Sequence, residues 1–153
     1  MKLVLLAFNI GESKCRPVPF TNGPGMSFLN FVKFIKKYNS KIEICVYTQL
    51  ETLRPIKGVV IGTLKQKSAV QSDIAAADAV HCWSGLTKEV LEHLEYAKRI
   101  NKKIFFGPNL IDTVQLDDEA LFLKRIRPDK IFFVNDRLRY LSQNKYKLDP
   151  AIT

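Results

Sequence analysis

Four short polar stretches of this chain could do chemistry, and each follows an apolar run. The first, Asn22 to Gly25, combines an asparagine, two glycines and a proline just before a patterned helix. Free backbone N–H groups and the positive end of a helix dipole attract anions at such a position. Gly23 and Gly25 would let a phosphate or sugar approach the backbone without a side chain in the way. A flexible loop closed by an ordinary helix start explains the same residues equally well.

The second stretch is DAVHCWS, from Asp78 to Ser84. As a strand, it sends the side chains of His81 and Trp83 to one face and that of Cys82 to the other. Ser84 can cap the helix that follows. A histidine in an apolar strand is more often a hydrogen-bonded core residue than a catalyst. His81 is therefore predicted to be a buried, hydrogen-bonded core residue, with a catalytic role as the alternative.

The third and fourth stretches each follow a run that begins Lys-Ile-Phe-Phe. The turn Gly107 to Leu110 would aim Asn109 into the same cleft, where its amide could hydrogen-bond a hydroxylated ligand. A turn asparagine that bonds its own backbone is the alternative. Asn135 and Asp136 begin the last helix, and capping is a sufficient explanation for them.

Other chemistries find little support in the sequence. G-x-G-x-x-G after the first strand, G-K-[ST] and G-x-S-x-G are all absent, which argues against NAD, ATP and a nucleophile elbow. The adjacent acids Asp117 and Asp118 are better explained by a helix dipole than by a metal, and no metal site is predicted. Cys82 cannot pair with His81, because neighbours on a strand point apart. No catalytic residue can be named.

The elements that must position these residues alternate along the chain. Six apolar runs predict strands, which cover Lys2–Phe8, Lys41–Thr48, Gly58–Thr63, Asp78–Trp83, Lys103–Gly107 and Lys130–Val134. Helical spacing predicts helices over Met26–Asn39, Gln66–Ala77, a segment within Ser84–Lys103, Asp117–Ile126 and Asn135–Asn144. In the third of these helices, His93 is expected on the surface. The alternation predicts a doubly wound, mostly parallel six-stranded sheet with helices on both faces, an α/β fold of the Rossmann-like kind.

Length, charge and cysteine content limit the classes of protein. A chain of 153 residues suits one domain. The net charge of +9 favours an anionic partner, although a merely soluble basic surface is the alternative. Three cysteines without C-x-x-C spacing suggest a reducing, cytoplasmic setting. The first apolar run is far shorter than the roughly 18 residues of a membrane span. Basic residues are too dispersed to predict specific nucleic-acid binding.

Taken in order, three segments resemble the N-terminal domain of a GT-B glycosyltransferase, nearest to the retaining family-4 type. They are NGPGMSFLNFVKFIKK, ADAVHCWSGLTKEVLEHLEYAKRINKKIFFGPN and KIFFVNDRLRYLSQNKYKLDP, and together they span most of the chain. The resemblance implies that residues 1–153 form one half of a two-domain enzyme, with the interdomain linker starting at 145–153. Two features depart from the family: the histidine that commonly follows the fifth strand is replaced by Gly107 to Leu110, and the second domain is absent.

The family implies transfer of a sugar from a nucleotide-sugar donor with retention, the donor being a substrate of the complete enzyme and no cofactor being bound by this domain alone. Gly23 and Gly25 would approach the donor phosphate or sugar. The acceptor cleft would be formed by Asn22, His81, Trp83, Ser84, Asn109 and Asn135. Expected partners are the missing donor-binding domain, a sugar or glycan acceptor and, at the basic surface, a membrane. The alternatives are a non-enzymatic α/β binding module for an acidic partner or membrane, and a small enzyme acting on a phosphorylated metabolite.

Overall fold

The computed structural model describes residues 1–7, 23–49, 55–84, 86–109 and 123–153. Its centre is one six-stranded sheet in the order β3-β2-β1-β4-β5-β6, in which all the neighbouring strands pair in parallel. The strands are β1 (Lys2–Ala7), β2 (Glu43–Thr48), β3 (Val59–Thr63), β4 (Ala79–Ser84), β5 (Lys103–Asn109) and β6 (Lys130–Ile131). Strand order reverses between β1 and β4, so the predicted doubly wound, Rossmann-like α/β fold is confirmed.

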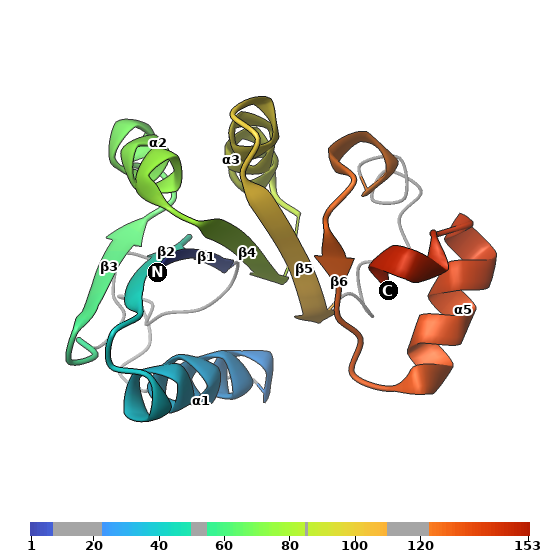
Figure 1. Cartoon of the computed structure of the whole chain (residues 1–153), viewed down its shortest axis with the longest axis horizontal. Helices are drawn as coiled ribbons and strands as arrows, with labels where there is room; N and C mark the ends of the chain where they lie inside the picture. The colour runs from blue at the N-terminus through green and yellow to red at the C-terminus, as the bar shows by residue number, and fades with distance from the viewer. Residues whose placement is uncertain (8–22, 50–54, 85, 110–122) are drawn as a thin grey trace, which may run out of the picture.

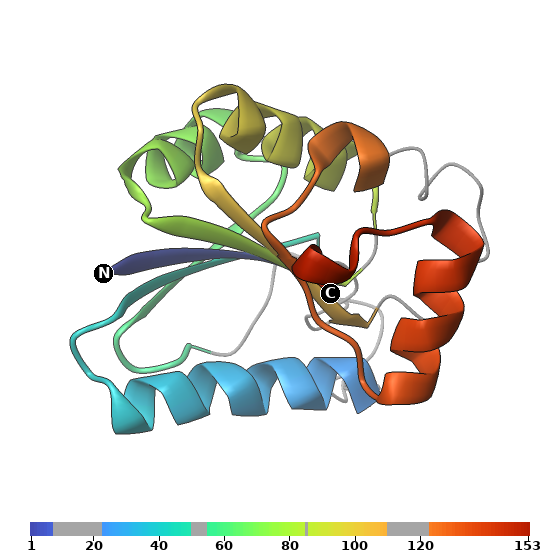
Figure 2. The ribbon, with the colours of Figure 1, turned by 45° about the vertical axis from the view of Figure 1, so that its right-hand side comes forward.

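Helices cover both faces of the sheet, as predicted, but unequally (Figure 1). One face carries α1 (Gly23–Tyr38), and the opposite face carries α2 (Lys67–Ala76), α3 (Lys88–Arg99) and the helical residues 123–126. Helix α5 (Asp136–Tyr146) and the short 3-10 helix η1 (Pro150–Ile152) lie beside the β6 edge (Figures 1 and 2). Among the described helices, α1 alone runs along the lower face, and no described helix lies beneath β5 and β6 there (Figure 1).

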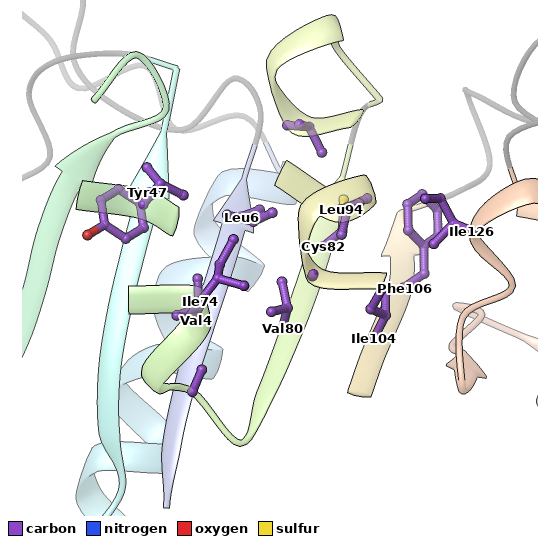
Figure 3. Close-up of a cluster of buried hydrophobic side chains, with 14 of the residues drawn as sticks. Val4, Leu6, Tyr47, Ile74, Val80, Cys82, Leu94, Ile104, Phe106 and Ile126 are labelled. Atoms are coloured by element: carbon purple, nitrogen blue, oxygen red, sulfur yellow. The ribbon is translucent and has the colours of Figure 1, made fainter. Parts of the chain in front are cut away.

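Two hydrophobic clusters hold the layers together, one on each face. Under α2 and α3, β1, β4 and β5 contribute Val4, Val80 and Phe106 to a cluster that Figure 3 shows in part. Under α1, Leu5 of β1 packs with Phe28 and Trp83. Burying a side chain of this size contributes roughly 1.5–3 kcal/mol. Successive β1 residues enter opposite clusters, which is why its sequence is apolar throughout.

Several predicted boundaries were wrong by a few residues. Helix α1 begins at Gly23 instead of Met26, because the first turn does not need the N–H that Pro24 lacks. Strand β5 continues past Gly107 to Asn109. Strand β6 keeps two of its five predicted residues, since pairing with β5 ends at Ile131. The helix predicted over Asp117–Ile126 lies largely outside the described residues.

Candidate functional site

The uncovered part of the sheet forms a cavity of about 670 Å³. Most of its wall is apolar, and its volume lies within the usual range for small-molecule sites, roughly 300–1,000 Å³. We call it the aromatic pocket, because five rings line it: Phe31, His81, Trp83, Phe105 and Phe132. Pro108 also lines the pocket, near the carboxyl ends of the strands. Toward the amino ends of the strands, the lining residues are Met1, Leu3, Asp78, Ala79 and Lys103.

Strand geometry brings the rings together. His81 and Trp83 are two residues apart on β4 and share a face, with ring centroids 5.7 Å apart. Phe105 lies opposite His81 in the β4–β5 register. Helix α1 adds Phe31, whose ring is 4.8 Å from that of Trp83. Phe132 follows β6, and its ring lies 5.8 Å from that of His81. His81 is therefore the centre of the group.

The predicted alternation of β4 is confirmed. Cys82 belongs to the cluster under α2 and α3, whereas Trp83 belongs to the cluster under α1. His81 is buried, as expected of a hydrogen-bonded core residue, and it also lines the pocket. His81 thus has the burial and the hydrogen bond expected of a core residue, and a role in binding a ligand stays a prediction.

The hydrogen bond of His81 fixes its tautomer. Its Nε2 lies 2.8 Å from the carbonyl oxygen of Gly107, which can only accept, so Nε2 carries the proton. Burial lowers the pKa of the imidazole, although the bond to Gly107 opposes this in part. The ring is therefore neutral near pH 7 and its Nδ1 is an acceptor.

Trp83 adds a donor to the same group. Its indole Nε1 is buried and has no hydrogen-bond partner among the described residues. Leaving a buried N–H unpaired costs about 1–3 kcal/mol. It is also the single tryptophan of the chain. Among the described residues, Trp83 thus contributes a buried donor without a partner to an otherwise apolar pocket.

Gly107 determines how closely β6 approaches this pocket. Its φ of +106° is a conformation that L side chains rarely adopt. A Cβ at this position would collide with the carbonyl oxygen of Phe132. Glycine is therefore required where the acceptor for His81 and the backbone of Phe132 meet.

The remaining predicted site residues lie elsewhere. Gly23 and Gly25 form part of the first turn of α1, and Asn22 lies outside the described residues. Ser84 and Asn109 are in register at the ends of β4 and β5, but their side chains are outside the described part of the chain. The Oδ1 of Asn135 accepts the Leu138 N–H at 3.0 Å, so Asn135 is the N-cap of α5.

Asn135 also lines a second cavity, of about 360 Å³, and does not line the aromatic pocket. The sequence reasoning missed Phe31, Phe105, Gly107, Pro108 and Phe132. A usable signal was present in the repeated tetrapeptide Lys-Ile-Phe-Phe at residues 103–106 and 130–133. In each copy the first phenylalanine, Phe105 or Phe132, lines the pocket, while Phe106 and Phe133 pack into the cluster on the other face.

The prediction that His93 lies on the surface was wrong. It is 2% exposed, and its Nε2 lies 3.0 Å from the carbonyl oxygen of Leu64. This bond satisfies a backbone acceptor between β3 and α2, which gives the histidine a structural role. It lies on the α2 side of the sheet and does not line the aromatic pocket.

A polar cluster between α2 and the strands β1 and β2 is also structural. Asp73 accepts from Tyr47 Oη at 2.5 Å and from Lys2 Nζ at 2.9 Å. Burial works against its charge, but these hydrogen bonds prevail and lower the pKa of Asp73. Burial and the bond to Asp73 raise the pKa of Tyr47. The cluster ties α2 to the sheet.

Two kinds of feature are absent from the part of the chain that the structure describes. No three His, Cys, Asp or Glu side chains there come together as a metal site would require. No helix there is long and apolar enough to cross a bilayer.

Comparisons with known proteins give the fold. No family model and no curated protein matches the chain. Among solved structures, it is similar to a DNA/pantothenate metabolism flavoprotein from Streptococcus pneumoniae, at 15% identity and a TM-score of 0.50, with 87% of this chain and 80% of that chain covered. A mutated uronate dehydrogenase also matches, at 12% identity and a TM-score of 0.41, with 67% of this chain and 38% of that one covered.

These findings correct the family resemblance. The similar structure is a flavoprotein and not a glycosyltransferase, so the predictions of a GT-B half and of sugar transfer were wrong. The three segments that suggested the family are strand, loop and helix units in chain order, and this pattern is common to Rossmann-like sheets of many functions. What the comparisons support is a Rossmann-like α/β domain.

Proposed function

We propose that this chain is a small-molecule-binding domain that holds a flat aromatic ring in the aromatic pocket, and that the ring is the isoalloxazine of a flavin. The carrying observation is the group of five rings around a cavity of about 670 Å³. An apolar cavity with a few polar atoms is the usual form of a small-molecule site. The alternative of an independent small enzyme acting on a phosphorylated metabolite has no such observation behind it.

The chemistry of the wall suits a heteroaromatic ligand. Stacked or edge-to-face aromatic pairs contribute about 0.5–1.5 kcal/mol beyond the burial of their area. His81 Nδ1 can accept from a ring N–H, and Trp83 Nε1 is a buried donor without a partner among the described residues. A flavin has both an imide N–H and carbonyl oxygens, so it offers a complement to each.

The position of the pocket also favours a ligand with a tail. Pro108 and Trp83 lie near the carboxyl ends of β5 and β4, which is the edge where Rossmann-like sheets bind ligands. Helix α1 begins with Gly23, after the carboxyl end of β1. Its first-turn N–H groups would suit a phosphate attached to the ring, which keeps the prediction for Gly23 and Gly25 as part of this proposal.

The choice of a flavin comes from the similar structure, which is described as a flavoprotein. At 15% identity that similarity supports the fold and only suggests the ligand. The pocket itself is compatible with any flat ring of comparable size. Riboflavin and FMN are therefore the first probes, and they differ in the phosphate alone.

Equilibrium dialysis with riboflavin and FMN tests the proposal. Phe132 is 45% exposed and lines the pocket, so Phe132→Ala should weaken binding about tenfold, as expected for a lost ring contact, with little effect on folding. Val134, 57% exposed, lines the second cavity and not the pocket, so Val134→Ala is the matched control. Equal affinities of the two variants, or no retention of either flavin, would overturn the proposal.

A further inference from the structure

The outward face of α1 combines exposed aromatic and basic side chains. Helical spacing places six exposed residues on it, and we call them the α1 outer face: Ser27, Asn30, Lys33, Phe34, Lys37 and Tyr38. Phe34 is 61% exposed and Tyr38 is 66% exposed. The opposite side of the helix buries Phe28 and Val32 against the sheet. The two exposed rings therefore do not hold α1 in place.

The two rings form one apolar unit. The centroids of Phe34 and Tyr38 are 4.5 Å apart with an interplanar angle of 44°. The Nζ of Lys37 lies 5.1 Å from the centre of the Tyr38 ring. Tyrosine and lysine side chains each have an apolar body and a polar tip. Exposed rings next to a lysine are therefore typical of protein and membrane interfaces.

The charged side chains of α1 all have the same sign. Helix α1 contains no Asp or Glu, and Lys33 and Lys37 both point outward. The Nζ of Lys36 is held by the carbonyl oxygens of Ser40 and Ile42, at 3.2 and 2.9 Å. Glu43, the next acid after the helix, is paired with Lys2 at 3.2 Å. No carboxylate of the helix therefore offsets the lysines.

Further lysines extend the basic surface at the end of the helix. Exposed Lys41 follows α1 directly. The Cε of Lys36 would lie 3.2 Å from a Cβ at Gly58, so the turn containing exposed Lys57 is adjacent. This local excess agrees with the net charge of +9 for the whole chain.

We propose that the α1 outer face binds the surface of an anionic membrane, with α1 parallel to the bilayer plane. Phe34 and Tyr38 would enter the headgroup region, and the lysines would contact lipid phosphates. A nucleic acid fits less well, because the two rings already pack against each other at 4.5 Å and leave no gap for a base. The proposal does not depend on the aromatic pocket.

Sedimentation with lipid vesicles tests this proposal on the intact chain. We expect binding to vesicles of phosphatidylcholine with phosphatidylglycerol, little binding to phosphatidylcholine alone, and release at high salt. Lys33→Glu with Lys37→Glu should weaken binding by about tenfold or more. Phe34→Ser with Tyr38→Ser should weaken it as well, because the charges alone give only part of the affinity.

The matched controls carry the same changes on other faces. Lys65 is exposed just before α2, and Lys88 is exposed at the start of α3. Lys65→Glu with Lys88→Glu therefore makes the same change in charge on other faces. Leu141 is 51% exposed on α5, and Leu141→Ser is the apolar control. Equal losses in the two charge pairs, equal binding to neutral vesicles, or binding to a single-stranded oligonucleotide in preference to vesicles would overturn the proposal.

Discussion

Replacing Gly107 by alanine should be among the most damaging small substitutions in the described sheet. The φ of +106° at this position lies outside the conformations that alanine adopts without strain. Its Cβ would also meet the carbonyl oxygen of Phe132, which is backbone and cannot rotate away. Either β5 or the segment after β6 must therefore move.

The size of the effect follows from what that movement breaks. Backbone strain of this kind costs about 1–3 kcal/mol. Two hydrogen bonds depend on the same geometry: His81 Nε2 to Gly107 at 2.8 Å, and the Phe132 N–H to the Phe106 carbonyl at 2.7 Å. Each contributes about 1 kcal/mol. We therefore expect Gly107→Ala to lower the free energy of unfolding by about 3 kcal/mol or more.

Gly58→Ala is the matched control. Gly58 has a φ of +74°, and a Cβ there would meet the flexible end of Lys36 at 3.2 Å. The expected cost is about 1–2 kcal/mol, from the left-handed backbone alone. Urea unfolding of both variants, followed by circular dichroism, gives the two free energies. A loss for Gly107→Ala no larger than that for Gly58→Ala would refute the reasoning about the approach of β6.

The remaining predictions concern buried titratable groups. Burial lowers the pKa of His81 below 6.5, so the unfolded chain takes up a proton that the folded chain does not, and stability should fall by up to about 1.4 kcal/mol per pH unit below pH 6.5. Urea titrations at several pH values should show this slope in the parent chain and not in His81→Gln. Tyr47→Phe should cost about 1–2 kcal/mol, because it removes the hydrogen bond to Asp73; no loss in urea unfolding would contradict this. Burial raises the pKa of Cys45 to about 11, so in a Cys15→Ser chain, whose two remaining cysteines are both buried, no thiol should react with Ellman's reagent at pH 8 before unfolding, and fast reaction of that native variant would count against it.

The sheet could be predicted because burial on both faces leaves a strong sequence signal. Unbroken apolar runs such as KLVLLAF are required where both faces of a strand are covered, and helical spacing between them specifies the crossovers. Boundaries were less certain, because they depend on pairing. Strand β6 stops at Ile131 where pairing with β5 ends, and the residues Phe132 to Val134 are still apolar.

The pocket could be predicted only in part. Alternation along β4 places His81 and Trp83 on one face, and this follows from sequence alone. The cavity lies where α1 ends and no described helix covers β5 and β6, which is a property of the packed layers. The wall of the pocket also depends on how closely the backbone of Gly107 on β5 approaches the carbonyl of Phe132 after β6, and these two residues are distant in the sequence. His93 was misplaced for the same reason, since its partner is the distant Leu64 carbonyl.

The family resemblance failed because it rested on local units. A glycine-bearing helix start, a strand with a histidine and a capped last helix occur in Rossmann-like folds with many functions. The ligand class depends on which side chains line the pocket, and these come from α1, β4, β5 and the end of β6.

The most direct test of a ring-binding pocket uses the single tryptophan of the chain. Trp83 gives one indole N–H signal in a two-dimensional ¹⁵N–¹H spectrum, so no assignment is needed. Titration with riboflavin should move this signal strongly and saturably, because a ring bound in the aromatic pocket lies beside the indole. Two results would contradict the account: an indole signal that does not move although riboflavin binds, and a complete lack of riboflavin binding.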